Sequence, residues 1–458
     1  MFEEIENNVA VEKIGHKGVS IWPIIKSYGI EFVDEMKVVK TANLSNIRIL
    51  LKSLAADLIS LSKLKKSPYW VFTNSERRYY INDLSFDRVT TGLIKYIDNY
   101  VLFENPIPKG RTKQNKLHQG EHLVGMSWIF LLQFLTIKLT SPPKIENLHL
   151  LEEYLGEDMS MIKKVYHRIY AGSFIYGALM RMLKPKAIFV VCYYSQFELI
   201  SAAKKYNIPV IELQHGLITE GHRAYFFKAK QSKKLMPDFF LSYGKYFSNI
   251  VSQGHLVGPN HVLDYGYSFL EEVGKHLTIS PKLSGLKEQY GTLVCVTGQL
   301  ETTDTELLRM IKKVSNEIPN ICFLFKPRLL NSFSHIDRPI NLLIAEDINT
   351  YELLKFCDVH ITVYSTCALE SLALGTPNVS IDIKGYYSKY MEHLLGDNPY
   401  NYEVRTFEDL RKTLQNLQEK TFEKEIIQKS IGHIFSPMVP PKTFHGFFQK
   451  IMKEISQQ

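Results

Sequence analysis

The part of this sequence best suited to chemistry is a predicted strand followed at once by a helix, at residues 359–377. The apolar run ends at Tyr364. Ser365 and Thr366 come directly after it, before residues that favour a helix as far as Leu374. Ser and Thr are natural N-cap residues, and a helix N-terminus presents free N–H groups and the positive end of its dipole. We therefore predict phosphate binding by Ser365 and Thr366.

A carboxylate follows about one turn inside the same predicted helix, at Glu370. In that place it can accept hydrogen bonds from both hydroxyls of a ribose. Gly375 is expected to cap the C-terminus of the helix, and Pro377 prevents its continuation. A phosphate site with a carboxylate one turn away predicts a nucleotide site. The alternative interpretation is a plain strand–helix unit with a well-capped helix.

Two cations, Lys326 and Arg328, stand on either side of Pro327 at the end of the apolar run 321–326. The predicted strand delivers both cations at its carboxyl end, and the proline stiffens the turn. Arginine binds phosphate through two parallel hydrogen bonds. We predict that both side chains contact the phosphates of a donor, with an ordinary pair of surface cations as the alternative.

A histidine lies at the tip of another predicted strand, at residues 209–213. Gln214, His215 and Gly216 follow that strand, and Gly216 permits a tight turn or the close approach of a ligand. Histidine titrates near neutral pH and therefore suits general base catalysis. We predict that His215 deprotonates an acceptor hydroxyl or holds the donor, beside an acceptor site that includes Gln214 and Gly216. The alternative is a histidine whose partners are backbone groups.

Polar residues after other predicted strands complete the set of candidates. Asp347 and Asn349 either pass near a nucleotide base or cap the next helix. The segment around residue 77 either binds the acceptor or forms a solvated loop. The further candidates are Glu220 and His222 as alternative catalytic groups, Gly298, Gln299 and Glu346 for the donor, and Arg77 and Arg78 for the acceptor.

These motifs resemble those of bacterial capsule, polysialic acid and Kdo transferases, which have the GT-B fold. In such enzymes a Ser-Ser/Thr pair precedes a helical Glu, as Ser365, Thr366 and Glu370 are arranged here. Where they often read Lys-Pro-His-Pro, with the histidine on the donor phosphate, this chain has Arg328 in place of that histidine. The Gln-His-Gly turn is also similar to that of surface-polysaccharide transferases and polyol-phosphate polymerases. The resemblance covers most of residues 187–381.

Apolar strands alternate with helices in two series, which predicts parallel sheets covered on both faces. The expected fold class is α/β of the GT-B type: two Rossmann-like domains whose parallel sheets face a central cleft, where ligands bind beyond the carboxyl ends of the strands. The predicted strands are 69–72, 187–192, 209–213 and 238–242 in the first series, and 293–297, 321–326, 341–345, 359–363 and 378–381 in the second.

We predict three parts of the chain. Residues 1–270 form an acceptor-binding domain and residues 271–435 a nucleotide-sugar-binding domain, which opens with a polar linker at 271–290. Residues 436–458 hold an amphipathic helix that packs back on the first domain. Within the first domain we expect helices at 50–65 and 91–101.

Composition narrows the class of protein further. The net charge is +8 without a long basic block, so nucleic-acid binding is not expected. The five cysteines include no CxxC pair, which argues against zinc and is typical of a reducing compartment. The chain has no Asp-x-Asp motif, a motif that GT-B enzymes generally lack. We therefore expect no metal ion and no cofactor besides the nucleotide-sugar co-substrate.

The N-terminus is acidic and has no basic region of the signal-peptide kind. The most apolar stretch, 126–137, is too short to span a bilayer. We expect a cytoplasmic protein with a peripheral contact to the inner face of the membrane, through 126–137 and residues 109–116 of the basic loop 109–119. A core helix at 126–137 is the competing interpretation.

The predicted function is metal-independent transfer of a sugar from a nucleotide-activated donor to a glycan or lipid-linked glycan acceptor, in the synthesis of a cell-surface polysaccharide. By resemblance the donor is either a CMP-linked ulosonic acid or a UDP-sugar. One alternative is a nucleotide-sugar 2-epimerase, which would need several acids and a histidine around the sugar. Another is a non-catalytic GT-B subunit of a polysaccharide assembly complex.

Overall fold

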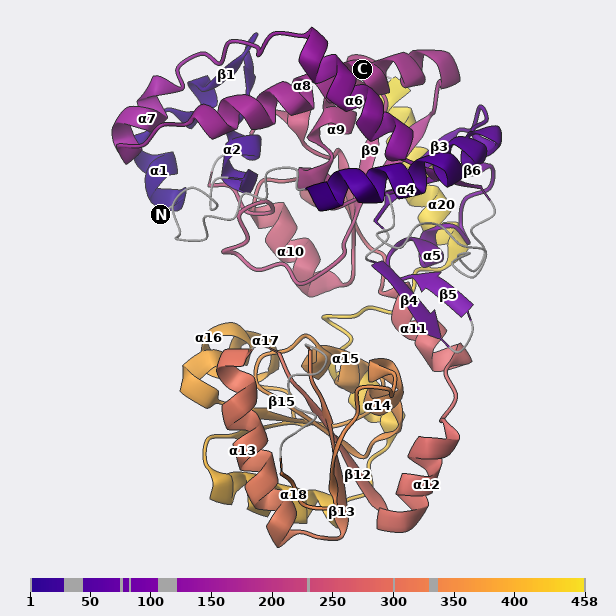
Figure 1. Ribbon diagram of the computed structural model, residues 1–458, viewed down its shortest axis with the longest axis vertical. Helices are drawn as coiled ribbons and strands as arrows, with labels where there is room; N and C mark the ends of the chain where they lie inside the picture. Colours follow the sequence, from indigo (N-terminus) through magenta and orange to yellow (C-terminus); the bar gives the residue numbers. More distant parts are fainter. Residues whose placement is uncertain are drawn as a thin grey trace. The chain divides into compact units, whose positions relative to one another are not determined.

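The computed structural model describes residues 2–28, 44–74, 77–81, 84–105, 122–228, 231–299, 301–328 and 337–456. The chain forms two compact units (Figure 1). The N-terminal unit consists of Met1–Phe269 together with Ser436–Gln458, and the C-terminal unit of Leu270–Phe435. The basic segment 109–119 lies outside the described residues.

The N-terminal unit is built on a parallel sheet whose described strands have the order β11-β10-β9-β8-β3-β6-β7. Its central strands are largely apolar and buried, as expected for a sheet covered on both faces. The order reverses between β3 and β8. The bounds are β3 Tyr69–Thr73, β6 Tyr100–Glu104, β7 Leu123–Gly125, β8 Ala187–Val191, β9 Val210–Leu213, β10 Phe239–Ser242 and β11 Val262–Asp264.

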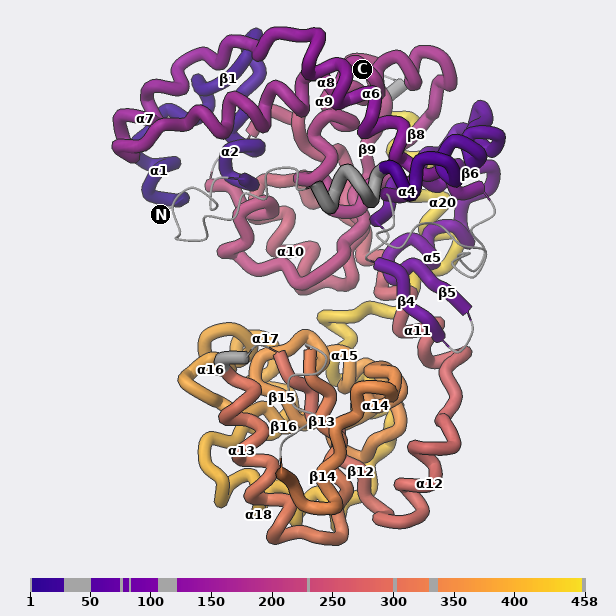
Figure 2. The backbone as a smooth tube through the Cα atoms, in the orientation of Figure 1, coloured from indigo at the N-terminus to yellow at the C-terminus, as the bar shows by residue number. Residues whose placement is uncertain are grey.

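Helices cover both faces of this sheet, because successive side chains of a strand point to opposite sides. On one face Phe72 of β3 contacts Tyr176 of α8 (Ser160–Leu183), with ring centroids 5.9 Å apart. On the other face Phe189 of β8 stacks on Phe448 of α20 (Pro441–Ser456). Helix α20 follows the C-terminal unit in sequence and returns to the N-terminal unit, where Figure 2 shows it in yellow.

The C-terminal unit holds a second parallel sheet, of order β14-β13-β12-β15-β16-β17. The order reverses between β12 and β15, and ligands of open α/β sheets bind at the carboxyl ends of the strands at such a point. The strands are β12 Thr292–Thr297, β13 Ile321–Lys326, β14 Leu342–Ile344, β15 Val359–Thr362, β16 Asn378–Ile381 and β17 Asn401–Val404; helices include α13 Glu301–Glu317, α14 Thr350–Phe356, α15 Cys367–Ala373 and α18 Phe407–Gln418.

The predicted α/β class is confirmed, and two local predictions are wrong. Residues 91–101 do not form one helix: α5 spans only Thr90–Leu93, and residues from Tyr100 onward pair with β3. Burial of a Tyr-Val-Leu-Phe run in the sheet outweighs its helical spacing.

The expected linker at 271–290 is instead helical, with α11 at Ser268–His276 and α12 at Pro281–Tyr290. Ser280 caps α12 by accepting the N–H of Leu283, and Pro281 occupies the first turn. This Ser-Pro start signal was present in the sequence. The helix is polar because most of it faces solvent.

Helix α6 (Ser127–Leu139) contains the most apolar stretch of the chain. Trp128, Ile129 and Gln133 are buried, whereas Phe134 and Leu139 are exposed. One side of this helix therefore belongs to the core and the other faces solvent. In the described part of the chain no helix combines the length and the apolar character needed to cross a membrane.

Candidate functional site

The reversal of strand order in the C-terminal unit brings two predicted segments together. Gly298 and Gln299 follow β12, and Ser365 and Thr366 follow β15, which is hydrogen-bonded to β12. Both segments therefore leave neighbouring strands at their carboxyl ends. This is the place where the fold favours a ligand.

Helix α15 begins at Cys367, with Thr366 as its N-cap residue. The side chain of Thr366 makes no capping hydrogen bond. Ser365 Oγ accepts the N–H of Cys367 at 3.3 Å instead. Gly375 has φ +84°, so only glycine fits this position without strain. The predicted strand–helix unit and its stop at Gly375 are present, but Ser365 alone provides the side-chain cap.

Glu370 is buried one turn into α15, with 5% of its surface exposed. Its Oε1 accepts a hydrogen bond of 2.8 Å from the hydroxyl of Tyr351 in α14. A carboxylate held by a neighbouring helix has a fixed orientation, and a nucleotide would meet it without reordering a flexible side chain. The sequence did not indicate this Tyr351 contact.

Lys326 and Arg328 have different surroundings. Lys326 Nζ donates to the backbone carbonyls of Glu346 and Ile348, at 2.7 Å each, and burial lowers the pKa of its ammonium group. It thus ties the end of β13 to the loop after β14. Arg328 is exposed, and its charge reaches Tyr364, next to Ser365. Of the two cations, Arg328 is the one presented to solvent.

The loop after β12 is fixed by Asp304 of α13. The backbone N–H of Gln299 donates to Asp304 Oδ1 at 2.7 Å, and a Cβ atom on Gly298 would lie 2.4 Å from Asp304 Oδ2. Glycine is therefore required by close approach at this point. The Oε1 atom of Gln299 is buried and has no hydrogen-bond partner among the described residues.

In the loop after β14, one of the two residues expected either near a base or at a helix cap is a helix cap. Asn349 accepts the N–H groups of Tyr351 and Glu352, so it is the N-cap of α14. Asp347 forms an ion pair with Lys282 at 2.8 Å, and the hydrogen bond from that lysine lowers the pKa of the carboxyl group.

In the N-terminal unit, His215 lies within a cluster of polar and aromatic side chains. Its Nε2 is 3.3 Å from Cys192 Sγ and 3.3 Å from the hydroxyl of Tyr194, and its Nδ1 is 3.4 Å from the hydroxyl of Tyr225. Burial lowers the pKa of His215 to about 3, with the charge of Arg77 adding to the effect. The imidazole is therefore neutral at physiological pH.

Glu212 of β9 lies behind this histidine and is fully buried. Its Oε1 accepts hydrogen bonds from the Tyr225 hydroxyl and from the backbone N–H of Tyr193, while its Oε2 has no partner among the described residues. Burial raises the pKa of Glu212 to about 8. Glu212 was not predicted from the sequence, although a glutamate inside the apolar strand Val-Ile-Glu-Leu was a signal.

His222 joins the same cluster. Its ring lies 4.7 Å from that of Tyr225, and its Nδ1 accepts the N–H of Ala224. Burial lowers its pKa to about 4. Glu220 is exposed, and its charge acts on Tyr246 of α10 (Lys245–Gln253). The structure thus brings His215 and His222 together, but not Glu220.

Two predicted acceptor residues are engaged within the protein. The buried amide of Gln214 donates to the carbonyl of Gly216 at 2.8 Å and accepts the N–H of Tyr243 at 2.7 Å. Arg78 forms a buried, two-pronged ion pair with Glu104, at 2.6 and 2.7 Å.

Arg77 and Gly216 lie closer to open space. Arg77 donates to the backbone carbonyl of His215 at 3.5 Å, and a Cβ atom on Gly216 would meet nothing within 4 Å. The backbone conformation nearby is also unusual, since Cys192 has φ +67°, a left-handed value rare outside glycine. Such strained positions are common at functional sites.

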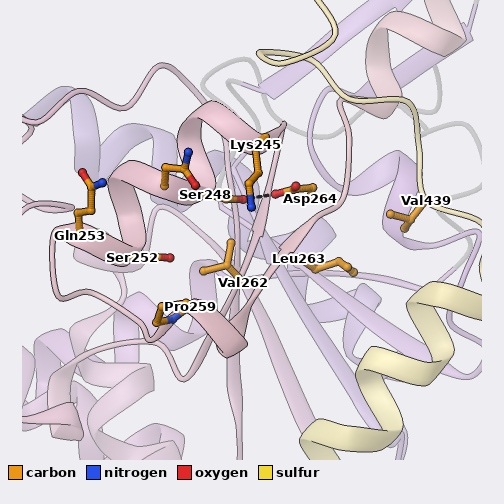
Figure 3. A pocket seen from close by; sticks show the side chains of 10 residues that line it. Lys245, Ser248, Ser252, Gln253, Pro259, Val262, Leu263, Asp264 and Val439 are labelled. Atoms are coloured by element: carbon orange, nitrogen blue, oxygen red, sulfur yellow. Dashed lines mark hydrogen bonds between the residues drawn. The ribbon is translucent and has the colours of Figure 1, made fainter.

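A hollow of about 570 Å³ lies between α10 and the edge strand β11 (Figure 3). Lys245, Ser248 and Asp264 line it, and Ser248 donates to Asp264. None of the residues singled out in the sequence lines this hollow. Among the described residues, no group of three His, Cys, Asp or Glu side chains is placed to hold a metal ion.

No protein-family model and no curated protein matches the sequence. Among solved structures, a Listeria monocytogenes protein assigned as a UDP-N-acetylglucosamine 2-epimerase has a TM-score of 0.51 at 12% identity, over 85% of this chain and 97% of the other. The UDP-GlcNAc 2-epimerase of Methanocaldococcus jannaschii has a TM-score of 0.50 at 11% identity, over 83% and 99%. The wall teichoic acid polymerase TagF has a TM-score of 0.46 at 14% identity, over 94% and 99%.

At these identities the likeness shows the fold. The chain has two α/β units, each with its own parallel sheet, and it shares the GT-B fold, as the sequence predicted. The two structures with a TM-score of at least 0.50 described above are named as epimerases of a nucleotide sugar.

Proposed function

We propose that this chain is a glycosyltransferase that moves a sugar from a nucleotide-activated donor, a CMP-linked ulosonic acid or a UDP-sugar, to a glycan or glycolipid acceptor of a cell-surface polysaccharide. The observation that carries the proposal is the carboxyl edge of β12 and β15, where Ser365 and the fixed carboxylate of Glu370 lie at the reversal of strand order.

The proposal assigns the nucleotide to the C-terminal unit. Glu370 receives the ribose, and Ser365, Thr366 and Arg328 receive the phosphates, whose charge grows as the sugar departs. Lys326 and Glu346 shape this site through the hydrogen bond of Lys326 to the Glu346 carbonyl. No metal ion is required.

The same proposal assigns the acceptor to the N-terminal unit. His215 deprotonates the acceptor hydroxyl through Nε2, which requires the proton of the neutral imidazole to reside on Nδ1. His215 is unprotonated at physiological pH, as a proton acceptor must be, but its pKa of about 3 makes it a weaker base than the near-neutral histidine expected from the sequence. Arg77 and the open space beside Gly216 form the acceptor surface next to it.

A thermal-shift screen against CMP, CDP, UDP and GDP tests nucleotide binding. A nucleotide at a hundred times its Kd adds about 2.7 kcal/mol of stability. No shift with any of them would contradict a donor site.

Product analysis then tests the reaction, with sugars linked to the nucleotide that stabilises the protein. A transferase releases free nucleotide only when an acceptor is present. A 2-epimerase, the second candidate because two epimerases share this fold, converts a UDP-sugar to its epimer without an acceptor. That product would replace our proposal.

We further propose that the N-terminal unit attaches peripherally to the inner face of the membrane through α6 and α4 (Leu44–Ser60), which pack against each other. Clusters of exposed apolar side chains commonly mark contacts with a membrane or another protein. Basic residues accompany the cluster on these helices, Lys52 in α4 and Lys138 in α6, which suits anionic lipid. Among the side chains described on the two helices, the exposed apolar ones are Leu51, Leu58, Ile59, Leu132, Phe134, Leu135 and Leu139.

A further inference from the structure

A second hollow of the N-terminal unit has a volume of about 410 Å³. It is bounded by the hairpin of β1 (Gly15–His16) and β2 (Val19–Ser20), by helices α8 and α9 (Phe197–Lys205), and by the short helix η6 (Lys233–Leu235). Helix α9 ends shortly before β9 begins, whereas His215 follows the other end of β9. The hollow and His215 therefore lie at opposite ends of that strand.

One wall of the hollow is a row of three aromatic rings. Tyr166, Tyr170 and Phe174 are spaced four residues apart on α8, so they share one face of the helix. The ring centroids of Tyr166 and Tyr170 are 6.5 Å apart, and those of Tyr170 and Phe174 are 4.9 Å apart. His16 packs edge-on against both tyrosines, and its Nδ1 donates to the carbonyl of Lys144 at 2.8 Å. The row is thereby held rigid, and Phe174 at its end is 47% exposed.

Lysines surround this row. Lys17 comes from the hairpin, Lys205 from α9 and Lys234 from η6, and all three line the hollow. Lys205 Nζ lies 5.6 Å from the centre of the Phe174 ring. A fourth lysine, Lys204, is paired with Asp238. The described lining includes no carboxylate, so lysine charge and aromatic rings line the hollow together.

These features favour one class of ligand. Flat C–H faces of sugar rings pack on aromatic side chains, and lysines bind carboxylates or other anionic substituents as point charges. The lysines at 17, 205 and 234 come from three different elements, beside the aromatic row. Ammonium groups carried by separate elements next to aromatic rings suit a ligand with negative charges on several sugars, whereas the charge of a nucleotide is concentrated on its phosphates.

We propose that this hollow binds an anionic saccharide, at a site separate from that of His215. A transferase with such a site would hold the polymer at a distance from the reacting end. The binding itself does not depend on the proposed transferase reaction.

Calorimetry at low salt tests the proposal, with a galacturonic acid tetramer as the anionic probe and maltotetraose as its uncharged counterpart. We expect the tetragalacturonate to bind and maltotetraose to bind at least about tenfold more weakly. Lys205→Gln with Lys234→Gln should weaken tetragalacturonate binding by about tenfold or more, because a hydrogen bond between an ammonium group and a carboxylate contributes roughly a factor of ten to affinity. Phe174→Ala should weaken binding of both saccharides.

Matched controls distinguish this site from general charge attraction and from the donor site. Lys164→Gln with Lys186→Gln removes the same charge from lysines of the same unit that do not line the hollow. An equal loss of affinity in this control would overturn the proposal, as would the absence of tetragalacturonate binding at low salt. Competition by CMP that depends on Lys205 and Lys234 would show a nucleotide site instead. Glu370→Gln should leave saccharide binding unchanged even where it removes nucleotide binding.

Discussion

The hydroxyl of Tyr225 lies 3.4 Å from Nδ1 of His215 and bonds to the buried carboxyl group of Glu212 on its other side. The raised pKa of about 8 leaves Glu212 largely protonated at physiological pH, and Tyr225 donates to its Oε1 atom. The phenol oxygen can then accept a hydrogen bond from Nδ1, which leaves Nε2 of His215 unprotonated, as a general base requires. Tyr225 thus links Glu212 to the Nδ1 side of His215.

Tyr225→Phe should therefore lower turnover while nucleotide affinity stays unchanged. Loss of a general base costs about 10²–10⁴-fold, and loss of its orienting partner should cost less, at least about tenfold. Tyr193→Phe is the matched control, because the buried hydroxyl of Tyr193 donates to the carbonyl of Ala224 and not to His215. An equal reduction of turnover in both variants would mean that burial of the hydroxyl, and not the contact with His215, is responsible.

The raised pKa of Glu212 also predicts how the stability of the protein depends on pH. Its pKa is raised to about 8 in the folded protein, against about 4.3 in an unfolded chain. Between these values the folded state binds the extra proton, so this group's contribution to stability falls as pH rises from about 4.3 to 8. Glu212→Gln keeps the acceptor oxygen and has no such titration. The melting temperature of this variant should rise relative to that of the wild type as pH increases from 5 to 8. A difference between the two melting temperatures that does not change with pH would contradict the assigned pKa.

Glu370→Gln should remove most nucleotide binding. The amide oxygen can still accept from Tyr351, so the packing of α15 on α14 is kept, and the melting temperature of the unliganded protein should hardly change. Replacement of a charged acceptor by a neutral one at two ribose hydroxyls should weaken binding by about tenfold or more. Glu352→Gln is a suitable control, because that buried glutamate accepts the N–H of Ser280. Undiminished affinity in Glu370→Gln would exclude the ribose assignment.

Local pattern in the sequence predicted the strands that position the site, because short apolar runs that alternate with helices favour buried strands of a parallel sheet. The helix predicted for segment 91–101 was wrong, because its last residues pair with the distant strand β3. The surroundings of single residues were less predictable. Lys326 bonds the carbonyls of the loop after β14, and Arg78 pairs with Glu104. Neither partner is near in sequence, so only the fold shows that these charges are already used.

Membrane attachment is tested by sedimentation with vesicles that contain anionic lipid. We expect the wild type to cosediment at low salt and to be released as salt increases, since screening weakens its lysine contacts. Phe134→Glu with Leu139→Glu should lower partitioning by at least about tenfold, because burial of each side chain is worth about 1.5–3 kcal/mol. Ile279→Glu with Ile426→Glu, at exposed apolar positions of the C-terminal unit, should have no effect. No binding at low salt would contradict the proposal.

The catalytic role of His215 is tested against that of His222. His215 Nδ1 lies near the Tyr225 hydroxyl, whereas His222 Nδ1 accepts a backbone N–H from Ala224. Both imidazoles are neutral at physiological pH because burial lowers the pKa of each, so the difference between them is geometric. His215 lies two residues after the end of β9, next to the open space at Gly216.

His215→Ala should therefore lower turnover by at least about two orders of magnitude, the ordinary cost of losing a general base, while nucleotide affinity changes little. His222→Ala, measured beside it, should retain most turnover, because its ring supports Tyr225 and its Nδ1 already bonds the backbone. If the two outcomes are reversed, His222 is the base. If both variants remain active, His215 is structural, and the reaction uses a carboxylate such as Glu220 or no protein base at all.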